Sequence, residues 1–300
     1  MFKLIFGLGN LDIENVKALA KLYAEAGAWM FDVSPFMLNA LNESIIECGL
    51  NPDDFKFCVS IPLEGDKHGK KAKIIENKCK KCSKCEKSCP QNAIINFVCD
   101  ENKCIGCSKC KKVCPHNAIE LYDKKDYFEA FKEILKAPCK IDCVELHASV
   151  PHKSRILKKL KKICKKYKGA ISLCISRKVF SLNDSLLLIQ KAREIAKDNA
   201  DFFVQADGNS MNCANSQPVS TLECVAFAAA LKDSGFDEKK IILSGGVNEF
   251  TKDLCHKFSL HPKALAFGTY ARKSVQNLSY DEALRSAKNL VLNACEACHG

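Results

Sequence analysis

The chain has 300 residues, of which 47% are hydrophobic, and its formal net charge is +11. The chain is therefore long and apolar enough to bury the core of one large domain or of two smaller ones. No apolar run approaches the roughly 18 residues of a membrane helix, and the apolar opening MFKLIFGLGN lacks a charged leader and a cleavage site. The twenty cysteines then indicate reduced thiols and metal ligands rather than a disulfide framework. We expect a cytoplasmic protein without membrane contact.

Outside one cysteine-rich segment, short apolar runs alternate with longer runs of helical periodicity. Eight consecutive strand–helix units are typical of a closed (β/α)8 barrel. A doubly wound open sheet is the alternative, but it usually has fewer strands, and only a fragment of its glycine fingerprint, GLGN at 7–10, follows the first strand. The expected strands are 2–9, 30–34, 55–63, 143–149, 170–176, 201–208, 240–247 and 264–271, and the expected helices are 12–28, 35–49, 125–135, 153–168, 183–197, 221–234, 249–258 and 280–297.

The cysteine-rich segment falls after the third strand and has its own internal repeat. We therefore expect an α/β protein with a TIM-type (β/α)8 barrel and an inserted bacterial-ferredoxin-like 2[4Fe-4S] domain after strand three. The barrel is expected to comprise residues 1–63 and 122–300, and the insertion residues 64–121.

The insertion contains two copies of one cysteine pattern, CKKCSKCEKSCPQNAI at 79–94 and CIGCSKCKKVCPHNAI at 104–119. Three cysteines two residues apart wrap one cubane cluster, whereas the fourth, before proline, ligates the other cluster. A pair of structural zinc sites is the alternative, but zinc does not require this crossed spacing. We predict that Cys79, Cys82, Cys85 and Cys114 hold one [4Fe–4S] cluster (cluster one), and that Cys104, Cys107, Cys110 and Cys89 hold another (cluster two).

The positive charge is concentrated in two lysine-rich runs, residues 66–84 and 153–168. One interpretation is that this charge attracts an acidic protein partner or a nucleic acid. The other is that the lysines form a solvated surface beside an anionic cluster. In the second run Ile156, Leu160 and Ile163 recur at helical spacing between lysines, which indicates an amphipathic surface helix. No nucleic-acid motif accompanies the charge, so we do not expect a nucleic acid as partner.

In a (β/α)8 barrel the chemistry lies at the carboxyl ends of the strands. Because the insertion follows strand three, we expect the clusters to lie over or beside this barrel mouth. Glu145 and His147 lie two apart on one strand and share a face, either as an acid/base pair or as a polar layer of the barrel. Polar residues at the expected strand ends are Asp32, Glu145, His147, Gln205, Asp207, Asn248 and Arg272, among which Glu145, His147 and Asp207 are the candidate catalytic residues.

The last two strands end in the glycine-containing sequences SGGVN at 244–248 and FGTYAR at 267–272. Small residues there expose backbone N–H groups that cradle a phosphate, which suggests a phosphorylated ligand such as FMN. Tight turns require glycine as well, so the pattern has two interpretations. The candidate cofactor-binding residues are Ser244, Gly245, Gly246, Gly268, Thr269 and Arg272.

Several motifs in chain order carry a resemblance to a known family: FKLIFGLGN, AGAWMFDVS, the tandem cysteine repeat, VQADGNSMN, ILSGGVN and AFGTYARK. Together they resemble the light-dependent period protein (LdpA) family, cyanobacterial iron–sulfur proteins linked to the redox input of the circadian clock. The resemblance covers nearly the whole chain. It implies two clusters on the cysteines named above, a redox-sensing or regulatory role, and a protein redox or signalling partner.

Two functions of different classes fit these residues. The first is a redox sensor or regulatory adaptor, in which the oxidation state of a cluster alters the binding of a partner. The second is an oxidoreductase whose clusters pass single electrons to a flavin or a phosphorylated substrate at the barrel mouth, by analogy with barrel enzymes that combine FMN and ferredoxin-like clusters. A purely structural role for the clusters is a third hypothesis, which predicts a redox-silent insertion.

Overall fold

A closed barrel of parallel strands forms the larger part of the computed structural model, which describes residues 1–66, 69–123, 126–136, 140–148, 150–208 and 217–299. The strands follow one another around the barrel in chain order, which confirms the predicted (β/α)8 fold. The barrel strands are β1 (Phe2–Ile5), β2 (Met30–Val33), β3 (Lys56–Pro62), β8 (Cys143–His147), β9 (Ala170–Ser176), β10 (Phe202–Asp207), β11 (Ile241–Ser244) and β12 (Ala264–Phe267).

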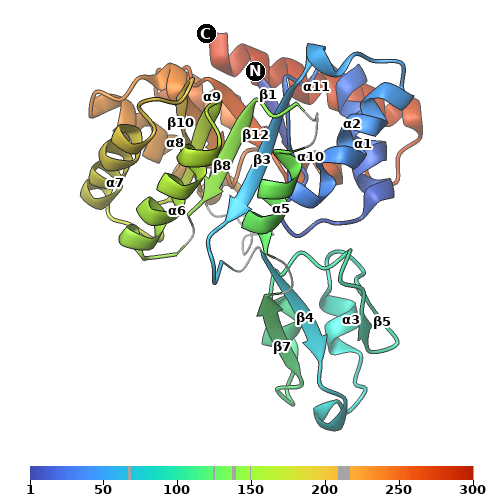
Figure 1. Ribbon diagram of the computed structural model, residues 1–300. Coiled ribbons are helices and arrows are strands. Elements are labelled where there is room, and N and C mark those ends of the chain that lie inside the picture. The colour runs from blue at the N-terminus through green and yellow to red at the C-terminus, as the bar shows by residue number, and fades with distance from the viewer. Residues whose placement is uncertain (67–68, 124–125, 137–139, 149, 209–216, 300) are drawn as a thin grey trace.

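Helices cover the outside of the barrel (Figure 1). Among the described residues, none of them is both long and apolar enough to cross a membrane. The helices around the barrel are α1 (Ile13–Glu25), α2 (Leu38–Glu47), α5 (Tyr127–Ile134), α6 (Lys153–Lys166), α7 (Leu182–Ile195), α8 (Gln217–Asp233), α9 (Thr251–Lys257), α10 (Thr269–Ser274) and α11 (Tyr280–His299).

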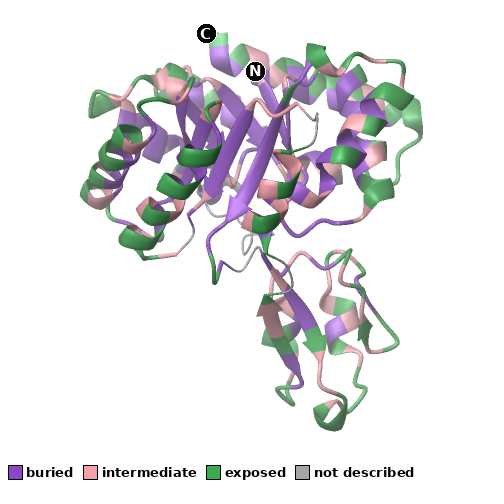
Figure 2. Ribbon diagram, viewed as in Figure 1, coloured by how far each residue is buried: buried purple, intermediate pink, exposed green. Residues whose placement is uncertain are grey.

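Burial explains why these segments form these elements. Strand β9 is buried from Ile171 to Ser176, as expected for a parallel strand with the barrel interior on one face and helices on the other. Helix α6 buries Ile156, Leu160 and Ile163 and leaves most of its lysines in solvent, which confirms the predicted amphipathic helix (Figure 2).

Several expected elements differ from the structure at their ends, and the expected strands 2–9 and 240–247 already end at Ile5 and Ser244. The expected strand 264–271 stops at Phe267, because Gly268 has a non-extended backbone (φ −111, ψ −102) and α10 begins at Thr269. Arg272 therefore lies on a short helix instead of a strand end. The expected helix 35–49 begins as a 3-10 turn, Pro35–Met37, and becomes α-helical only at Leu38.

The insertion leaves the barrel without interrupting it, because β3 pairs directly with β8, with Cys58 opposite Cys143. In Figure 1 the arrowheads of β3 and β8 point toward the insertion, and both chain termini lie at the opposite end of the barrel. The insertion thus lies at the carboxyl ends of the strands, as predicted. Its elements are β4 (Lys70–Ile74), α3 (Lys84–Ser88), β5 (Ile94–Ile95), β6 (Val98–Cys99), α4 (Lys109–Val113) and β7 (Ile119–Asp123), with β4–β7 and β5–β6 paired antiparallel.

A buried lysine ties the insertion to the loop that follows β1. The Lys71 ammonium donates to the carbonyl oxygens of Gly9 and Cys104, at 2.5 Å each, and Lys71 is only 1% exposed. Close by, the Leu11 backbone N–H donates to the carbonyl of Asn102 at 3.0 Å. These bonds hold the second cysteine repeat against the mouth of the barrel.

Candidate metal centre and barrel cavity

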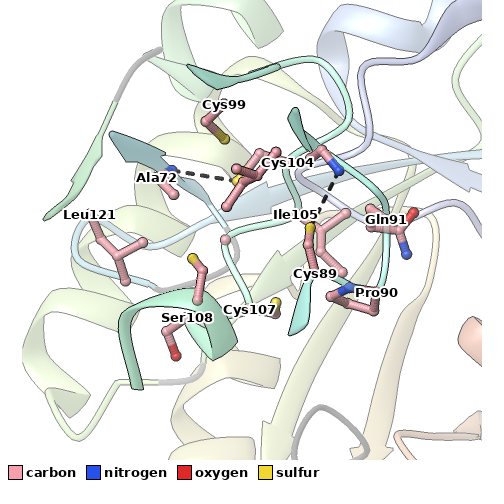
Figure 3. Close-up of a pocket in the computed structure, with 14 residues that line it drawn as sticks. Ala72, Cys89, Pro90, Gln91, Cys99, Cys104, Ile105, Cys107, Ser108 and Leu121 are labelled. Carbon is pink, nitrogen blue, oxygen red and sulfur yellow. Dashed lines mark hydrogen bonds between the residues drawn. The ribbon is translucent and has the colours of Figure 1, made fainter. Parts of the chain in front are cut away.

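The eight cysteines of the repeat surround two separate cavities, and each cavity takes three cysteines from one repeat and the fourth from the other. One cavity is lined by Cys104, Cys107, Cys110 and Cys89 (Figure 3). The second cavity is lined by Cys79, Cys82, Cys85 and Cys114. This grouping is the crossed arrangement that the spacing predicts for two clusters.

The backbone follows the same path in the two repeats, 25 residues apart. Ser83 and Ser108 precede the short helices α3 and α4 with φ of 56 and 61, and Asn92 and Asn117 both have φ of 48. These left-handed turns reverse the chain and bring the cysteines on both sides of each turn toward one cavity. Lys81 has a φ of 52 at the position that Gly106 fills in the second repeat.

Backbone N–H groups point at the cysteine sulfurs. Ala93 donates to Cys89 Sγ at 3.3 Å, and the equivalent Ala118 donates to Cys114 Sγ at 3.4 Å. Ala72 likewise donates to Cys104 Sγ at 3.4 Å (Figure 3). Hydrogen bonds of this kind stabilise thiolates and, at iron–sulfur sites, help to set the reduction potential.

The repeat cysteines do not form a preformed zinc site. Four sulfurs bound to zinc at ~2.3 Å stand only about 3.8 Å apart. Among the described residues, the only side chains with three metal-binding atoms within 4.8 Å of one another are Asp32, Cys58 and Glu145, none of which belongs to the cysteine repeat.

A fifth thiol lies beside the cavity of cluster two. Cys99 lines this cavity together with the four predicted ligands (Figure 3). Its Sγ donates a long hydrogen bond to the Asp100 carbonyl at 3.9 Å. Cys99 is thus a thiol beside the predicted ligands that the cysteine pattern does not include.

Below the cavity of cluster two lies a larger one, of about 250 Å³, in the mouth of the barrel. Pro90, Gln91, Ile105 and Cys107 line both cavities, so the loops that carry the cluster-two cysteines form the wall between them. The barrel cavity gathers all of the predicted strand-end residues: Asp32, Glu145, His147, Gln205, Asp207, Ser244, Gly245, Gly246, Asn248, Gly268, Thr269 and Arg272.

The floor of the barrel cavity is a buried array of charges centred on Lys3. The Lys3 ammonium lies 2.6 Å from Asp32 Oδ2, 2.8 Å from Glu145 Oε2 and 2.8 Å from Gln205 Oε1. The ammonium donates hydrogen bonds to Glu145 and Gln205 and forms a close ion pair with Asp32, and the carboxylates raise the pKa of Lys3 above its usual value in spite of burial. Lys3 is therefore a fixed cation rather than a nucleophilic amine.

Asp32 is the least satisfied group of this array. Ser60 Oγ donates to its Oδ1, but Oδ2 accepts no hydrogen bond of good geometry, although it contacts Lys3. Burial raises the pKa of Asp32 to about 6, with Lys3 opposing the shift and Glu145 adding to it. Glu145, by contrast, also accepts from Gln205 Nε2 at 3.1 Å and Ser172 Oγ at 3.4 Å.

His147 forms a separate ion pair at the edge of the cavity. Its Nδ1 lies 2.7 Å from Asp66 Oδ2, and it also contacts the Cys174 thiol. Burial opposes the charge, but Cys174 and Asp66 raise the pKa of His147 well above its usual value. Glu145 and His147 share a strand face as predicted, yet each has its own partners, and no hydrogen bond between the two is among the described contacts.

The glycine turns at the ends of β11 and β12 differ in how closely neighbouring atoms pack around the glycine. Gly245 (φ +64) packs so closely on Asp207 that an added Cβ would lie 1.6 Å from its Oδ1. Around Gly268, by contrast, an added Cβ would meet only ordinary contacts at 3.9 Å. Close packing therefore explains Gly245 without a ligand, whereas the space beside Gly268 is open.

Arg272 lines the same end of the cavity without a carboxylate partner. It donates to the Ile5 carbonyl at 2.8 Å and to Thr269 Oγ1 at 3.2 Å. No carboxylate of the described residues lies within ion-pair distance of it, and burial lowers its pKa to about 10. Arg272 is thus a poorly solvated cation at the cavity wall.

Sequence reasoning missed Lys3, Lys71 and Cys99. The signal for Lys3 was a single lysine inside an apolar strand, since an isolated charge among residues buried on both faces requires buried partners. Cys99 gave no comparable signal, because it lies outside the repeated cysteine pattern and a single cysteine more often serves as a small apolar residue.

Comparisons with known proteins agree with this site. A family model described as "4Fe-4S binding domain" matches residues 72–95 and 100–120. Among curated proteins, none matches the chain significantly. Solved structures similar to the chain include a truncated 3-deoxy-D-arabino-heptulosonate 7-phosphate synthase from Thermotoga maritima, with 10% identity, a TM-score of 0.49, and coverage of 97% of this chain and 84% of that one. Another is tryptophan synthase from M. tuberculosis in its aminoacrylate-bound form, with 7% identity, a TM-score of 0.48, and coverage of 98% and 92%.

The second family match covers more than half of the chain. The model described as "Light dependent period A C-terminal domain" matches residues 134–298, which contain β8 to β12 and the helices around them. Together with the 4Fe-4S match and the closed barrel, it identifies the chain as an iron–sulfur protein with a redox or regulatory role. The chain belongs to the light dependent period A family.

Proposed function

We propose that this protein is a redox sensor or regulatory adaptor that holds two [4Fe–4S] clusters in its insertion. The observation that carries the proposal is the grouping of the repeat cysteines around two cavities, each with a ligand from the other repeat. The ligands of cluster one are then Cys79, Cys82, Cys85 and Cys114, and those of cluster two are Cys104, Cys107, Cys110 and Cys89.

The two clusters have different surroundings, which suggests different tasks. Cys82, a ligand of cluster one, is exposed, and so are the neighbouring Lys80, Lys81 and Lys84. A positively charged surface of this kind attracts an acidic redox or signalling protein. We therefore assign the partner contact to the cluster-one end of the insertion and place the protein in the reducing cytoplasm.

The surroundings of cluster two connect it to the barrel. Its ligand Cys107 lies in the wall of the barrel cavity, and the carbonyl of Cys104 accepts a hydrogen bond from Lys71, which also binds Gly9. Reduction adds one negative charge to a cluster, so its effect would be felt by the cavity and by the loop after β1. This path supports a sensor in which the redox state alters the barrel mouth.

A second candidate function is an oxidoreductase, and the position of the barrel cavity favours it. A flavin or a phosphorylated substrate bound in this cavity beside Cys107 would lie within reach of an electron from cluster two. Ser244, Gly246, Gly268, Thr269 and Arg272 would hold the phosphate. The candidates for proton transfer are Glu145, His147 and Asp207.

Anaerobic purification followed by iron, sulfide and visible spectroscopy tests the proposal. About eight iron and eight sulfide per chain, with an absorbance near 400 nm that dithionite bleaches, are expected for two clusters. Structured flavin bands in the same spectrum would support the oxidoreductase. A spectrum without flavin bands would support the sensor. Zinc in place of iron under strict anaerobiosis would refute both functions.

A further inference from the structure

The charges of the barrel cavity are separated into two ends. The floor holds the carboxylates of Asp32 and Glu145 around one ammonium, that of Lys3. His147 does not alter this balance, because Asp66 neutralises it in a pair of their own. When both floor carboxylates are ionised, the floor therefore has one buried negative charge in excess.

Asp32 is the floor carboxylate with the fewest hydrogen bonds, although its Oδ2 lies 2.6 Å from the Lys3 ammonium. Asp32 Oδ2 is buried, in a residue that is 2% exposed, and accepts no hydrogen bond of good geometry from the described residues. Asp32 and Glu145 also line the cavity, so the excess negative charge of the floor acts on a group bound there. A buried excess charge is costly, and a cationic group of a ligand offsets it.

The opposite condition holds at the wall where β12 ends. The Arg272 guanidinium binds backbone carbonyls and the Thr269 hydroxyl, but no carboxylate of the described chain balances its charge. Lys273 lines the cavity beside it and adds a second positive charge. An anionic group is the ligand that this wall lacks.

We propose that the barrel cavity binds a small zwitterion, with its ammonium group against Asp32 and Glu145 and its anionic group against Arg272. The anion is a phosphate or a carboxylate, since a guanidinium binds both in the same geometry. This inference goes beyond the proposed function, because it concerns the occupant of the barrel and holds whether the clusters sense or transfer electrons.

Anaerobic titration calorimetry on the full chain, with its iron content measured on the same sample, tests the zwitterion. The probes are ω-aminoalkyl phosphates with chains of two to six carbons, and the controls are alkyl phosphates of equal length without the ammonium. We expect at least one aminoalkyl phosphate to bind about tenfold or more tightly than its control, the effect of one charge-assisted hydrogen bond. Equal affinities at every length, or no binding by a protein that contains its iron, would overturn the proposal.

Two further experiments separate the contribution of Asp32 from that of the anion-binding wall. The preference for the ammonium should disappear in Asp32→Asn and persist in Asp54→Asn, a matched change at an exposed position. Persistence in Asp32→Asn would refute the role of Asp32. The ω-amino carboxylates identify the anion, because tighter binding than the phosphates assigns a carboxylate and weaker binding a phosphate. If the protein contains no iron, only the proposed function is refuted. The zwitterion proposal is still tested, because the comparison of probes on the wild-type protein does not require iron.

Discussion

Replacement of Lys3 by methionine tests the charge array on which the barrel interior depends. Lys3 is 0% exposed, and its ammonium contacts Asp32, Glu145 and Gln205 at 2.6 to 2.8 Å. Methionine fills a similar volume but leaves two buried carboxylates beside each other without a cation. Removing one partner of a buried ion pair costs about 3–5 kcal/mol, and we expect Lys3→Met to lower the free energy of unfolding at pH 8 by that amount.

The loss should depend on pH with a definite sign. The pKa of Asp32 is already raised to about 6 by burial, and Lys3 is the group that opposes this shift. Without Lys3 the pKa rises further, so the folded variant binds a proton more tightly than the unfolded chain does. The stability of Lys3→Met relative to wild type should therefore improve as the pH falls from 8 toward 5.5, because protonation of Asp32 removes the repulsion.

Trp29, the single tryptophan, makes the assay specific to the barrel, since it lies directly before β2. Anaerobic urea unfolding followed by its fluorescence gives the free energy at each pH. Lys17→Met, at a solvent-exposed ion pair with Glu47, is the matched control and should cost less than about 1 kcal/mol. A Lys3→Met loss below about 1 kcal/mol, or a loss that is the same at pH 8 and pH 5.5, would refute the reasoning.

Three further predictions follow from the same contacts. Gly245→Ala should lower the thermal unfolding midpoint more than Gly49→Ala does, because the new Cβ would lie 2.8 Å from the backbone nitrogen of Gly208 and would displace the Asp207 carboxylate, whereas Gly49→Ala, with φ +73 and open space, should cost only about 1 kcal/mol; equal midpoints would contradict this. Cys99→Ala should retain about eight iron per chain, because Cys99 lines the cavity of cluster two without being one of its four predicted ligands; iron analysis that finds only about four would contradict this. Lys80→Glu combined with Lys84→Glu should slow reduction by an acidic ferredoxin at low salt and have little effect at high salt, and stopped-flow rates that are equal at low salt would exclude this docking surface.

The sequence was sufficient for features that depend on short-range patterns. The crossed cysteine sets follow from spacing within one segment, and the barrel follows from the alternation of strands and helices along the chain. The same alternation placed Glu145 and His147 on one face of one strand. The end of β12 was predicted too late, because a single residue, Gly268, changes strand into helix there and the apolar pattern continues through it.

The partners of Lys3 could not be predicted from short-range sequence patterns. Lys3 meets Glu145 across 142 residues and Gln205 across 202, and only closure of the barrel brings them together. The wall shared by the two cavities has the same origin, since Cys107 reaches the barrel mouth through the pairing of β3 with β8 and the bonds of Lys71. Residue types and spacing predict ligands within a segment, but contacts between distant segments need the fold.

The positions of iron in crystals grown without oxygen test the central claim most directly. Anomalous scattering at the iron edge should locate two iron sites, one surrounded by the sulfurs of Cys104, Cys107, Cys110 and Cys89, and the other by those of Cys79, Cys82, Cys85 and Cys114. The first should lie beside the wall of the barrel cavity. Iron bound by the four cysteines of each repeat separately, or single metal ions in place of clusters, would contradict the account.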